Sequence, residues 1–366
     1  MPFKGGFLGV DLFFVLSGYL ITTILLNEYE RHSTISFKNF YVKRILRLFP
    51  PILIAIIFFI IPVFFTDRPS AISNIVSLLT YTGNCFMLVQ HFTGLPYPLL
   101  SGHSWSLAVE EQFYLTFPFL LYLALKYYRR KKTGNLISLF PLFWVLYFLI
   151  VIVSSILLGK WFYKFFFWRF FEIYLGTFIA LIYSDAYQRI SKESDFSRRV
   201  KEFVQRVYSN KIVLIVSIVM VTALILYPTK FSFYVIIDIT NLNYIFFTFF
   251  CSVLIINVVY PVHSFYANVL SNKVLVSVGK ISYGLYLYTP FISRCVAKWF
   301  YDGNPFQSTK TKLISDIISI CASLAFSYLS FYLIERNILK LKHRFTEVRK
   351  NRKVRDMEDE GIPKAI

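Results

Sequence analysis

The chain has 366 residues, of which 56% are hydrophobic, 20% aromatic and 16% charged, and its mean hydropathy is +0.57. A chain of this length cannot bury so much apolar surface in one core, so the composition excludes a water-soluble globular protein and predicts an all-α, polytopic membrane protein. The formal net charge of +19 would suggest nucleic-acid binding in a soluble protein, but here Lys and Arg gather in alternate polar segments, so we expect no nucleic-acid partner.

Apolar segments long enough to cross a membrane as helices recur along the chain, since about 20 residues at about 1.5 Å each span the hydrocarbon core. We expect a transmembrane helix bundle of about nine spans. They are predicted near residues 7–26, 48–65, 107–125, 137–158, 166–183, 212–227, 244–260, 274–292 and 313–334. Asn, Thr and Gln residues interrupt the semi-polar run from Ala71 to Phe92, so we expect a re-entrant or surface-lying segment there.

The positive-inside rule orients these spans, because cytoplasmic loops of membrane proteins are enriched in Lys and Arg. The basic segments at 129–132 and 189–211 then lie in the cytoplasm, which places the N-terminus outside and the C-terminus inside. Residues 1–335 are predicted to form the transmembrane domain, and the basic residues 336–366 a cytoplasmic tail near anionic membrane lipid. The four cysteines lie far apart and match no ligand spacing, so no metal site is predicted.

Two adjacent carboxylates, Glu110 and Glu111, enter the apolar segment that begins near Leu107. Two interpretations are open. In the first, Ser104 or Ser106 caps the helix start, and the glutamates are ordinary N-terminal charges that the helix dipole favours. In the second, the glutamates face a polar cavity and bind, position or transfer protons, as acidic residues at membrane depth commonly do.

Other charged residues also lie in or beside the expected spans. Asp11 lies early in the first span, where the neighbouring glycines favour close helix packing. Arg44 and Arg47 are three residues apart, so on a helix they share a face at the cytoplasmic boundary, where they either set topology or hold a phosphorylated donor. Arg169 and Glu172 have the same spacing and form either an intrahelical ion pair or part of a cavity wall.

These segments, taken together and in order, resemble the acyltransferase-3 family of integral membrane acyltransferases. The residues that carry the resemblance lie at 5–18, 44–50 and 104–115, with weaker matches at 169–176, 279–288 and 332–336. The resemblance implies transfer of an acyl group, usually acetyl from acetyl-CoA, to a hydroxyl of a cell-envelope or exported polysaccharide such as peptidoglycan. It further implies a multi-pass protein of the bacterial cytoplasmic membrane with no permanently bound cofactor.

The resemblance also implies roles for individual residues. Arg44 and Arg47 match the family's RxxR motif, which lies at the cytoplasmic face and is associated with the CoA donor. We expect Asp11, His103 and Glu110 to form the catalytic set, with Asp11 orienting a base or binding the acceptor. The residues expected to bind the acceptor or shape its cavity are Trp105, Ser106, Glu111, Tyr114, Arg169 and Glu172.

The chain departs from the family pattern in its histidines. Members normally have a preceding helix that carries an Arg and the His taken as the catalytic base, upstream of the Gly5-Gly6-Phe7 segment. A His common after the 279–288 block is also replaced, since Thr289-Pro290 follows. We therefore expect the acyltransferase domain to be N-terminally incomplete. His103 is then the best substitute base, and its alternative roles are to orient its loop or to bind the acceptor.

Two other functions are compatible with the same sequence. Many helices, aromatic walls and buried charges also suit a transporter of polysaccharide or lipid-linked sugar, although no internal repeat is visible. A catalytically inactive, truncated acyltransferase homologue would bind donor or partner without turnover. Consumption of acetyl-CoA distinguishes the enzyme from both.

Overall fold

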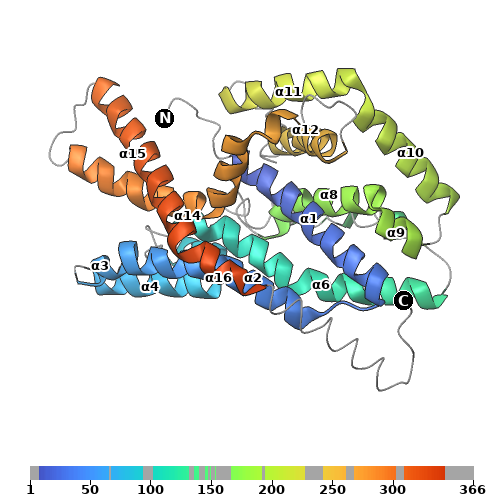
Figure 1. Ribbon diagram of the computed structural model, residues 1–366, viewed down its shortest axis with the longest axis horizontal. Helices are drawn as coiled ribbons and strands as arrows, with labels where there is room; N and C mark the ends of the chain where they lie inside the picture. The colour runs from blue at the N-terminus through green and yellow to red at the C-terminus, as the bar shows by residue number, and fades with distance from the viewer. Residues whose placement is uncertain are drawn as a thin grey trace, which may run out of the picture. The chain divides into compact units, whose positions relative to one another are not determined.

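The computed structural model describes residues 8–65, 67–93, 102–131, 136–139, 145, 146, 149, 153, 166–191, 194–226, 242–260, 268–301 and 309–342. Within these ranges all regular secondary structure is helical (Figure 1), which confirms the all-α prediction. The chain forms two compact units, which we call the first unit (residues 1–35 and 76–276) and the second unit (residues 36–75 and 277–366). Most of the span predicted at 137–158 and most of the tail, at 343–366, lie outside the described residues.

The first unit contains α1 (Gly9–His32), α5 (Gly83–Thr93), η3 (Gly102–Ser104), α6 (Trp105–Lys131), η4 (Leu136–Leu139), α8 (Phe166–Tyr183), α9 (Asp185–Ile190), α10 (Asp195–Ser209), α11 (Lys211–Leu226) and α12 (Leu242–Val259). Its centre is the pair α1 and α8, which pack along each other. A Cβ atom at Gly18 would collide with the backbone of Ile173, and one at Gly176 with the backbone of Val15, whereas Gly9 has open space around it. Gly18 therefore has the packing role predicted for glycine in the first span.

The semi-polar run from Ala71 to Phe92 does not form one continuous helix. Helix α4 (Arg68–Thr80) ends before Tyr81, which has a φ of 52°, and α5 then begins at Gly83. The left-handed backbone at Tyr81 stops the first helix, because a non-glycine residue with positive φ cannot continue it. Two short helices are what we would expect of a run that does not cross the membrane as a single span.

The second unit contains α2 (Phe37–Ala55), η2 (Ile56–Ile60), α3 (Ile61–Phe64), most of α14 (Lys273–Tyr301), α15 (Thr309–Ser330), η6 (Phe331–Glu335) and α16 (Arg336–Lys340). Aromatic rings hold it together. Phe59 stacks on Phe291 with ring centroids 5.1 Å apart, and Tyr288 meets Phe326 edge to face at 5.0 Å. Such ring pairs add to the apolar area that the helices bury against each other.

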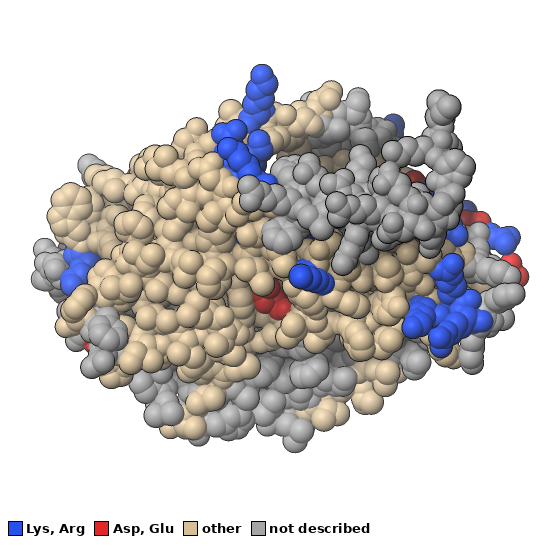
Figure 2. Space-filling view, turned by 60° about the horizontal axis from the view of Figure 1, so that its bottom comes forward, with Lys and Arg blue, Asp and Glu red and all other residues tan. Residues whose placement is uncertain are grey.

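Long apolar helices occur in both units. Three helical stretches of the described residues, Gly9–His32, Phe37–Val63 and Thr311–Lys340, are long and apolar enough to cross a membrane. The pair α10 and α11 passes the same test but is bent by 64°. The face drawn in Figure 2 has broad areas without charged side chains, and Lys and Arg gather in small groups beside them. These features are those of an integral membrane protein, and the larger number of about nine spans stays a prediction.

Candidate functional site

A cluster of three buried ionic side chains lies between α1 and α8. Arg169 forms ion pairs with Asp11 and with Glu172, the latter at 2.5 Å between Nη1 and Oε1. These three residues, which we call the buried ion cluster, have side chains that are at most 3% exposed. The pair of Arg169 and Glu172 is the intrahelical contact that their spacing predicted, and Asp11 adds a partner from another helix.

The buried ion cluster contains two carboxylates and one guanidinium, so it carries an excess of negative charge when all three groups are ionised. Asp11 Oδ2 and Glu172 Oε2 have no hydrogen-bond partner among the described residues. Burial of a charge without a partner costs several kcal/mol. The two oxygens therefore favour a proton or a hydrogen-bond donor brought by a ligand, such as a hydroxyl group.

Trp105, the first residue of α6, lies beside the buried ion cluster. The Cζ atom of Arg169 lies 5.2 Å from the centroid of the Trp105 ring, and the ring of Phe14 meets Trp105 edge to face at 6.4 Å. A guanidinium over an indole face gains cation–π attraction, which is stronger away from water. Trp105 is partly exposed, so its ring borders both the cluster and the surface.

Glu110 joins α6 to α1. Its Oε1 atom accepts hydrogen bonds from the Ser17 hydroxyl of α1 and from the Tyr114 hydroxyl one turn further along α6. Glu110 and Glu111 are both partly buried. Because Glu110 is bound by two side chains from different helices, the helix dipole alone does not account for its position. Glu110 therefore links α1 to α6, and its exposure to a polar cavity stays a prediction.

The start of α6 differs in one respect from the sequence prediction. Ser104 is 2% exposed, and its hydroxyl has no hydrogen-bond partner among the described residues, so Ser104 does not cap the helix. Ser106 lies inside α6, and its hydroxyl donates to the carbonyl of His103 at 3.5 Å. His103 itself belongs to η3 and is partly exposed, two residues before Trp105.

An amide pair near this helix start was not anticipated from the sequence. Asn84 of α5 and Gln112 of α6 exchange hydrogen bonds of 2.9 and 3.1 Å, and Gln112 also donates to the carbonyl of Tyr81 at 3.2 Å. The sequence feature that could have predicted this pair is Gln112 itself, a polar residue next to Glu111 in an apolar helix. Its effect is to fix α5 against the end of α6 that carries Trp105.

Arg44 and Arg47 belong to the second unit, on α2, together with Lys43. Lys342, just after α16, joins them: burial, together with the positive charges of Arg47, Arg44 and Lys43, lowers its pKa to about 8. The Cζ atom of Arg44 lies 5.7 Å from the centroid of the Phe40 ring. We call Lys43, Arg44, Arg47 and Lys342 the basic cluster. The sequence predicted its two arginines but not its lysine from the tail.

Helices able to span a membrane, together with charged side chains buried between them, define an integral membrane protein with a polar internal site. The family model described as an acyltransferase domain, Acyl_transf_3, matches residues 4–335. The chain therefore belongs to this acyltransferase family, as the motifs predicted.

Relatives with assigned names are O-acetyltransferases. The chain is 42% identical over 139 residues to the peptidoglycan O-acetyltransferase OatA of Listeria monocytogenes. The matched region covers 35% of this chain and 22% of OatA. It is 29% identical over 349 residues to a Staphylococcus aureus protein assigned as an O-acetyltransferase, covering 90% of this chain and 52% of that protein. It is 37% identical over 147 residues to Bacillus subtilis YrhL, assigned as a peptidoglycan O-acetyltransferase. That match covers 38% of this chain and 23% of YrhL.

The chain thus spans about half the length, or less, of these relatives. No solved structure matches it.

Proposed function

We propose that this chain transfers an acetyl group from acetyl-CoA to a hydroxyl of peptidoglycan or another envelope polysaccharide, at the bacterial cytoplasmic membrane. Family membership and the names of the relatives support the reaction class and the carbohydrate acceptor. The observation that carries the proposal is the buried ion cluster beside Trp105, in which two carboxylate oxygens have no hydrogen-bond partner among the described residues. Sugar hydroxyls bind to such acceptors, and sugar rings pack on such an aromatic face.

The reaction needs a base and a group that positions the acceptor. The acceptor oxygen attacks the thioester carbonyl, the new ester bond forms, the bond from carbonyl carbon to sulfur breaks, and the hydroxyl proton finally protonates the departing CoA thiolate. We assign Asp11 and Glu110 to orientation of the acceptor or the base, and His103 to the base, because an imidazole titrates near neutral pH. Trp105, Ser106, Glu111 and Tyr114 would line the acceptor site.

We assign donor binding to the basic cluster. Coenzyme A carries several phosphate groups, and guanidinium groups bind phosphate through paired, charge-assisted hydrogen bonds. Arg44 and Arg47 supply such groups on one side of α2, and Lys342 adds a third cation close to both. Like charges held together repel one another, so an anionic ligand would stabilise this region.

The test is acetyl transfer by the purified full chain in proteoliposomes, supplied with labelled acetyl-CoA and peptidoglycan fragments. We expect labelled, alkali-sensitive ester on the glycan and an equal amount of free CoA thiol. Asp11→Asn should lower kcat with little change in the KM for acetyl-CoA, because Asp11 acts on the acceptor side. Movement of glycan without CoA release would indicate the transporter alternative, and donor binding without turnover would indicate an inactive homologue.

A further inference from the structure

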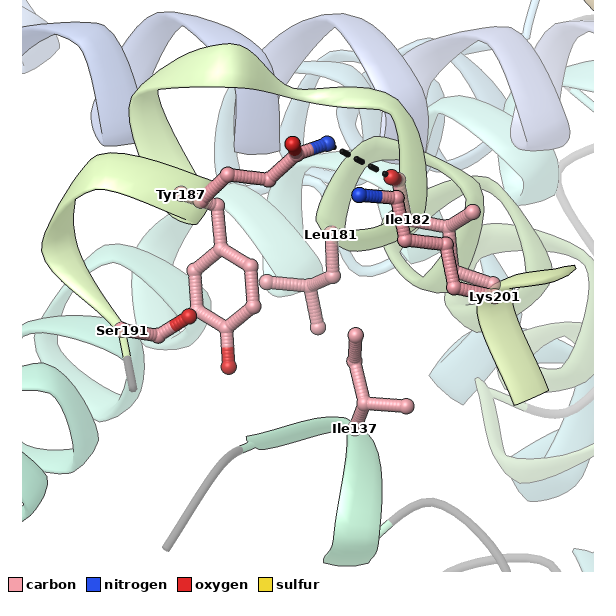
Figure 3. Close-up of a pocket in the computed structure, with 7 residues that line it drawn as sticks. Ile137, Leu181, Ile182, Tyr187, Ser191 and Lys201 are labelled. Carbon is pink, nitrogen blue, oxygen red and sulfur yellow. Dashed lines mark hydrogen bonds between the residues drawn. The ribbon is translucent and has the colours of Figure 1, made fainter. Parts of the chain in front are cut away.

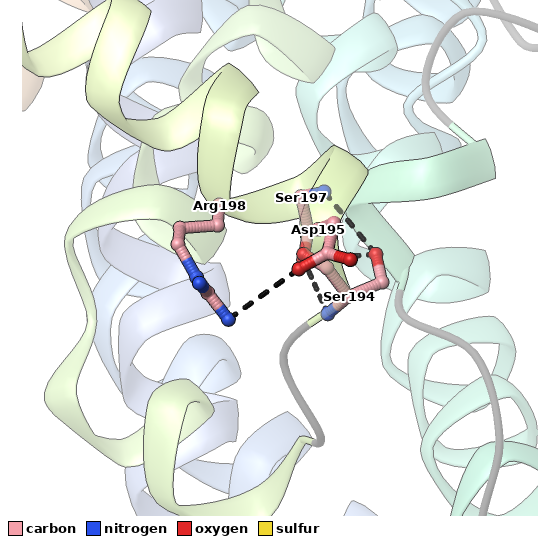
Figure 4. Close-up of polar contacts among 4 residues, drawn as sticks. All are labelled: Ser194, Asp195, Ser197 and Arg198. Atoms are coloured by element: carbon pink, nitrogen blue, oxygen red, sulfur yellow. Dashed lines mark hydrogen bonds and ion pairs between the residues drawn. The ribbon is translucent and has the colours of Figure 1, made fainter.

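Helix α10 has a sharply defined start and mixed chemistry along its length. Ser194 and Ser197 form a reciprocal capping box: the Ser194 hydroxyl accepts from the Ser197 amide at 3.1 Å, and the Ser197 hydroxyl accepts from the Ser194 amide at 2.9 Å (Figure 4). Arg198 pairs with Asp195 at 3.6 Å in the first turn. Such capping stabilises the start of a helix, because it satisfies backbone N–H groups that have no partner within the helix.

One face of α10 is anchored to the first unit. The hydroxyl of Tyr208 lies 2.8 Å from the hydroxyl of Ser252 in α12, and the carbonyl of Tyr208 accepts from the side-chain amide of Asn257 at 2.9 Å. Further back along the helix, Lys201 lines a cavity of about 60 Å³ together with Tyr187 and Ser191 (Figure 3). The helix is therefore fixed with one particular side turned away from the protein.

The outward side of α10 carries two large aromatic residues in a basic setting. Phe196 and Phe203 are 48% and 67% exposed. They are two helical turns apart and so lie on one line, and Arg199 and Arg206, both exposed, follow the neighbouring line with the same spacing. Exposed phenylalanines flanked by arginines are the pattern of a helix that lies in a membrane interface.

The next helix supports this orientation. Helix α11 exposes Ile212, Ile215 and Val219, at 70%, 59% and 58%, as expected for a lipid-facing span. Helix α10 meets the start of α11 at a bend of 64°, and in Figure 1 α10 runs steeply away from that junction. If α11 crosses the membrane, the axis of α10 is therefore turned away from the direction of α11 and toward the plane of the membrane surface. The surrounding loop is the basic one that the positive-inside rule places in the cytoplasm.

We propose that α10 lies in the cytoplasmic interface of the membrane, with Phe196 and Phe203 among the acyl chains and Arg199 and Arg206 bound to the phosphates of anionic lipids. Charge complementarity favours this occupant, because the inner leaflet is negative and each nearby arginine adds to the attraction. This proposal does not depend on the catalytic activity.

Hydrogen exchange of the full chain in nanodiscs that hold one copy each provides the test. We expect amides of residues 195–209 to exchange roughly thirtyfold more slowly with phosphatidylglycerol present than in phosphatidylcholine alone, since two arginines contribute. Arg199→Gln with Arg206→Gln should remove that difference. The matched control, Arg198→Gln, changes an exposed arginine of the same helix that is paired with Asp195, and should keep the difference.

A second variant tests the aromatic contact. Phe203→Ser should speed exchange of α10 in both lipids, while Glu202→Ser at the adjacent exposed position should not. Unchanged exchange in α8 shows that each variant is folded. Equal exchange in the two lipids, or exchange that slows only when a second copy or a cytosolic protein is added, would overturn the proposal and assign this face of α10 to a protein partner.

Discussion

The buried ion cluster and the basic cluster are built in opposite ways. The buried ion cluster places one cation between two carboxylates, with side chains at most 3% exposed. The basic cluster collects positive charges only, on residues that are half-buried or exposed. Opposite charges held together attract one another, whereas like charges held together repel one another and attract anions. The buried ion cluster is therefore held together by attraction between its own side chains, whereas the proposed role of the basic cluster is to bind an anionic donor.

The largest effect is expected at Arg169. Arg169→Gln leaves two carboxylates buried without their cation, so the free energy of unfolding should fall by about 3–5 kcal/mol. The measurement is thermal or denaturant unfolding in detergent. Asp11→Asn in the same chain should restore part of the loss, because it removes one of the unpaired charges.

Arg336→Gln is the control for Arg169, since Arg336 is an exposed arginine that lies over the Tyr332 ring. It should change stability by no more than about 0.5 kcal/mol. If Arg169→Gln were as mild as this control, the buried ion cluster would not be a structural element.

The basic cluster should show the reverse pattern. Arg44→Ala or Arg47→Ala should raise the KM for acetyl-CoA about tenfold or more, because each loses charge-assisted hydrogen bonds of about 1.5–3 kcal/mol. Stability should change little, since reduced repulsion within the cluster offsets lost contacts such as that of Arg44 with the Phe40 ring. Lys38→Ala, on the same helix and exposed, serves as the control. An unchanged KM in both arginine variants would remove the donor assignment.

The close contact of α1 and α8 holds Asp11 against Arg169, and it can be loosened directly. Gly18→Ala should destabilise the protein by about 1–3 kcal/mol, because the new methyl group meets the backbone of Ile173. Gly9→Ala, in the same helix but in open space, should not destabilise it. Equal unfolding temperatures for the two variants would contradict the packing account.

The smallest effect concerns Lys342 and pH. Its pKa in the folded chain is lowered to about 8 from the ordinary 10.5, so the folded state disfavours the charged lysine. Stability should therefore rise as pH increases from about 8 toward 10.5, by less than about 1 kcal/mol for a half-buried side chain. Affinity for acetyl-CoA should fall over the same range, as the lysine loses its proton.

Unfolding temperature and donor affinity, measured from pH 7 to pH 10, check both trends. Lys342→Gln should flatten each curve. If the unfolding temperature of the parent chain fell from pH 7 to pH 10, and Lys342→Gln followed the same curve, Lys342 would not lie close to the two arginines.

Local features of the fold were predictable from the sequence. Helix α8 ends at Tyr183, where the predicted span 166–183 ends, because an apolar run with a clear end specifies a helix. The pair of Arg169 and Glu172 followed from a spacing of three residues. Contacts between residues less than two turns apart in one helix can thus be predicted from their spacing in the sequence.

Contacts between distant parts of the chain were not predictable in this way. Asp11 and Arg169 are 158 residues apart, and nothing in either segment specifies that they meet. The same holds for Ser17, whose surroundings suggested packing, although its hydroxyl donates to Glu110. Lys342 looked like one of many tail lysines. Its place in the basic cluster depends on α16 packing against α2, which hydropathy does not encode.

The measurement that tests the central claim most directly is the steady-state rate of CoA release at varied acetyl-CoA and glycan, for the parent, Asp11→Asn and Arg44→Ala chains. We expect that Asp11→Asn lowers kcat at an unchanged KM for acetyl-CoA, and that Arg44→Ala raises that KM while kcat is largely retained. If both variants changed the same kinetic parameter, or if the parent chain released no CoA in the presence of glycan, the assignment of the buried ion cluster to the acceptor and of the basic cluster to the donor would be wrong.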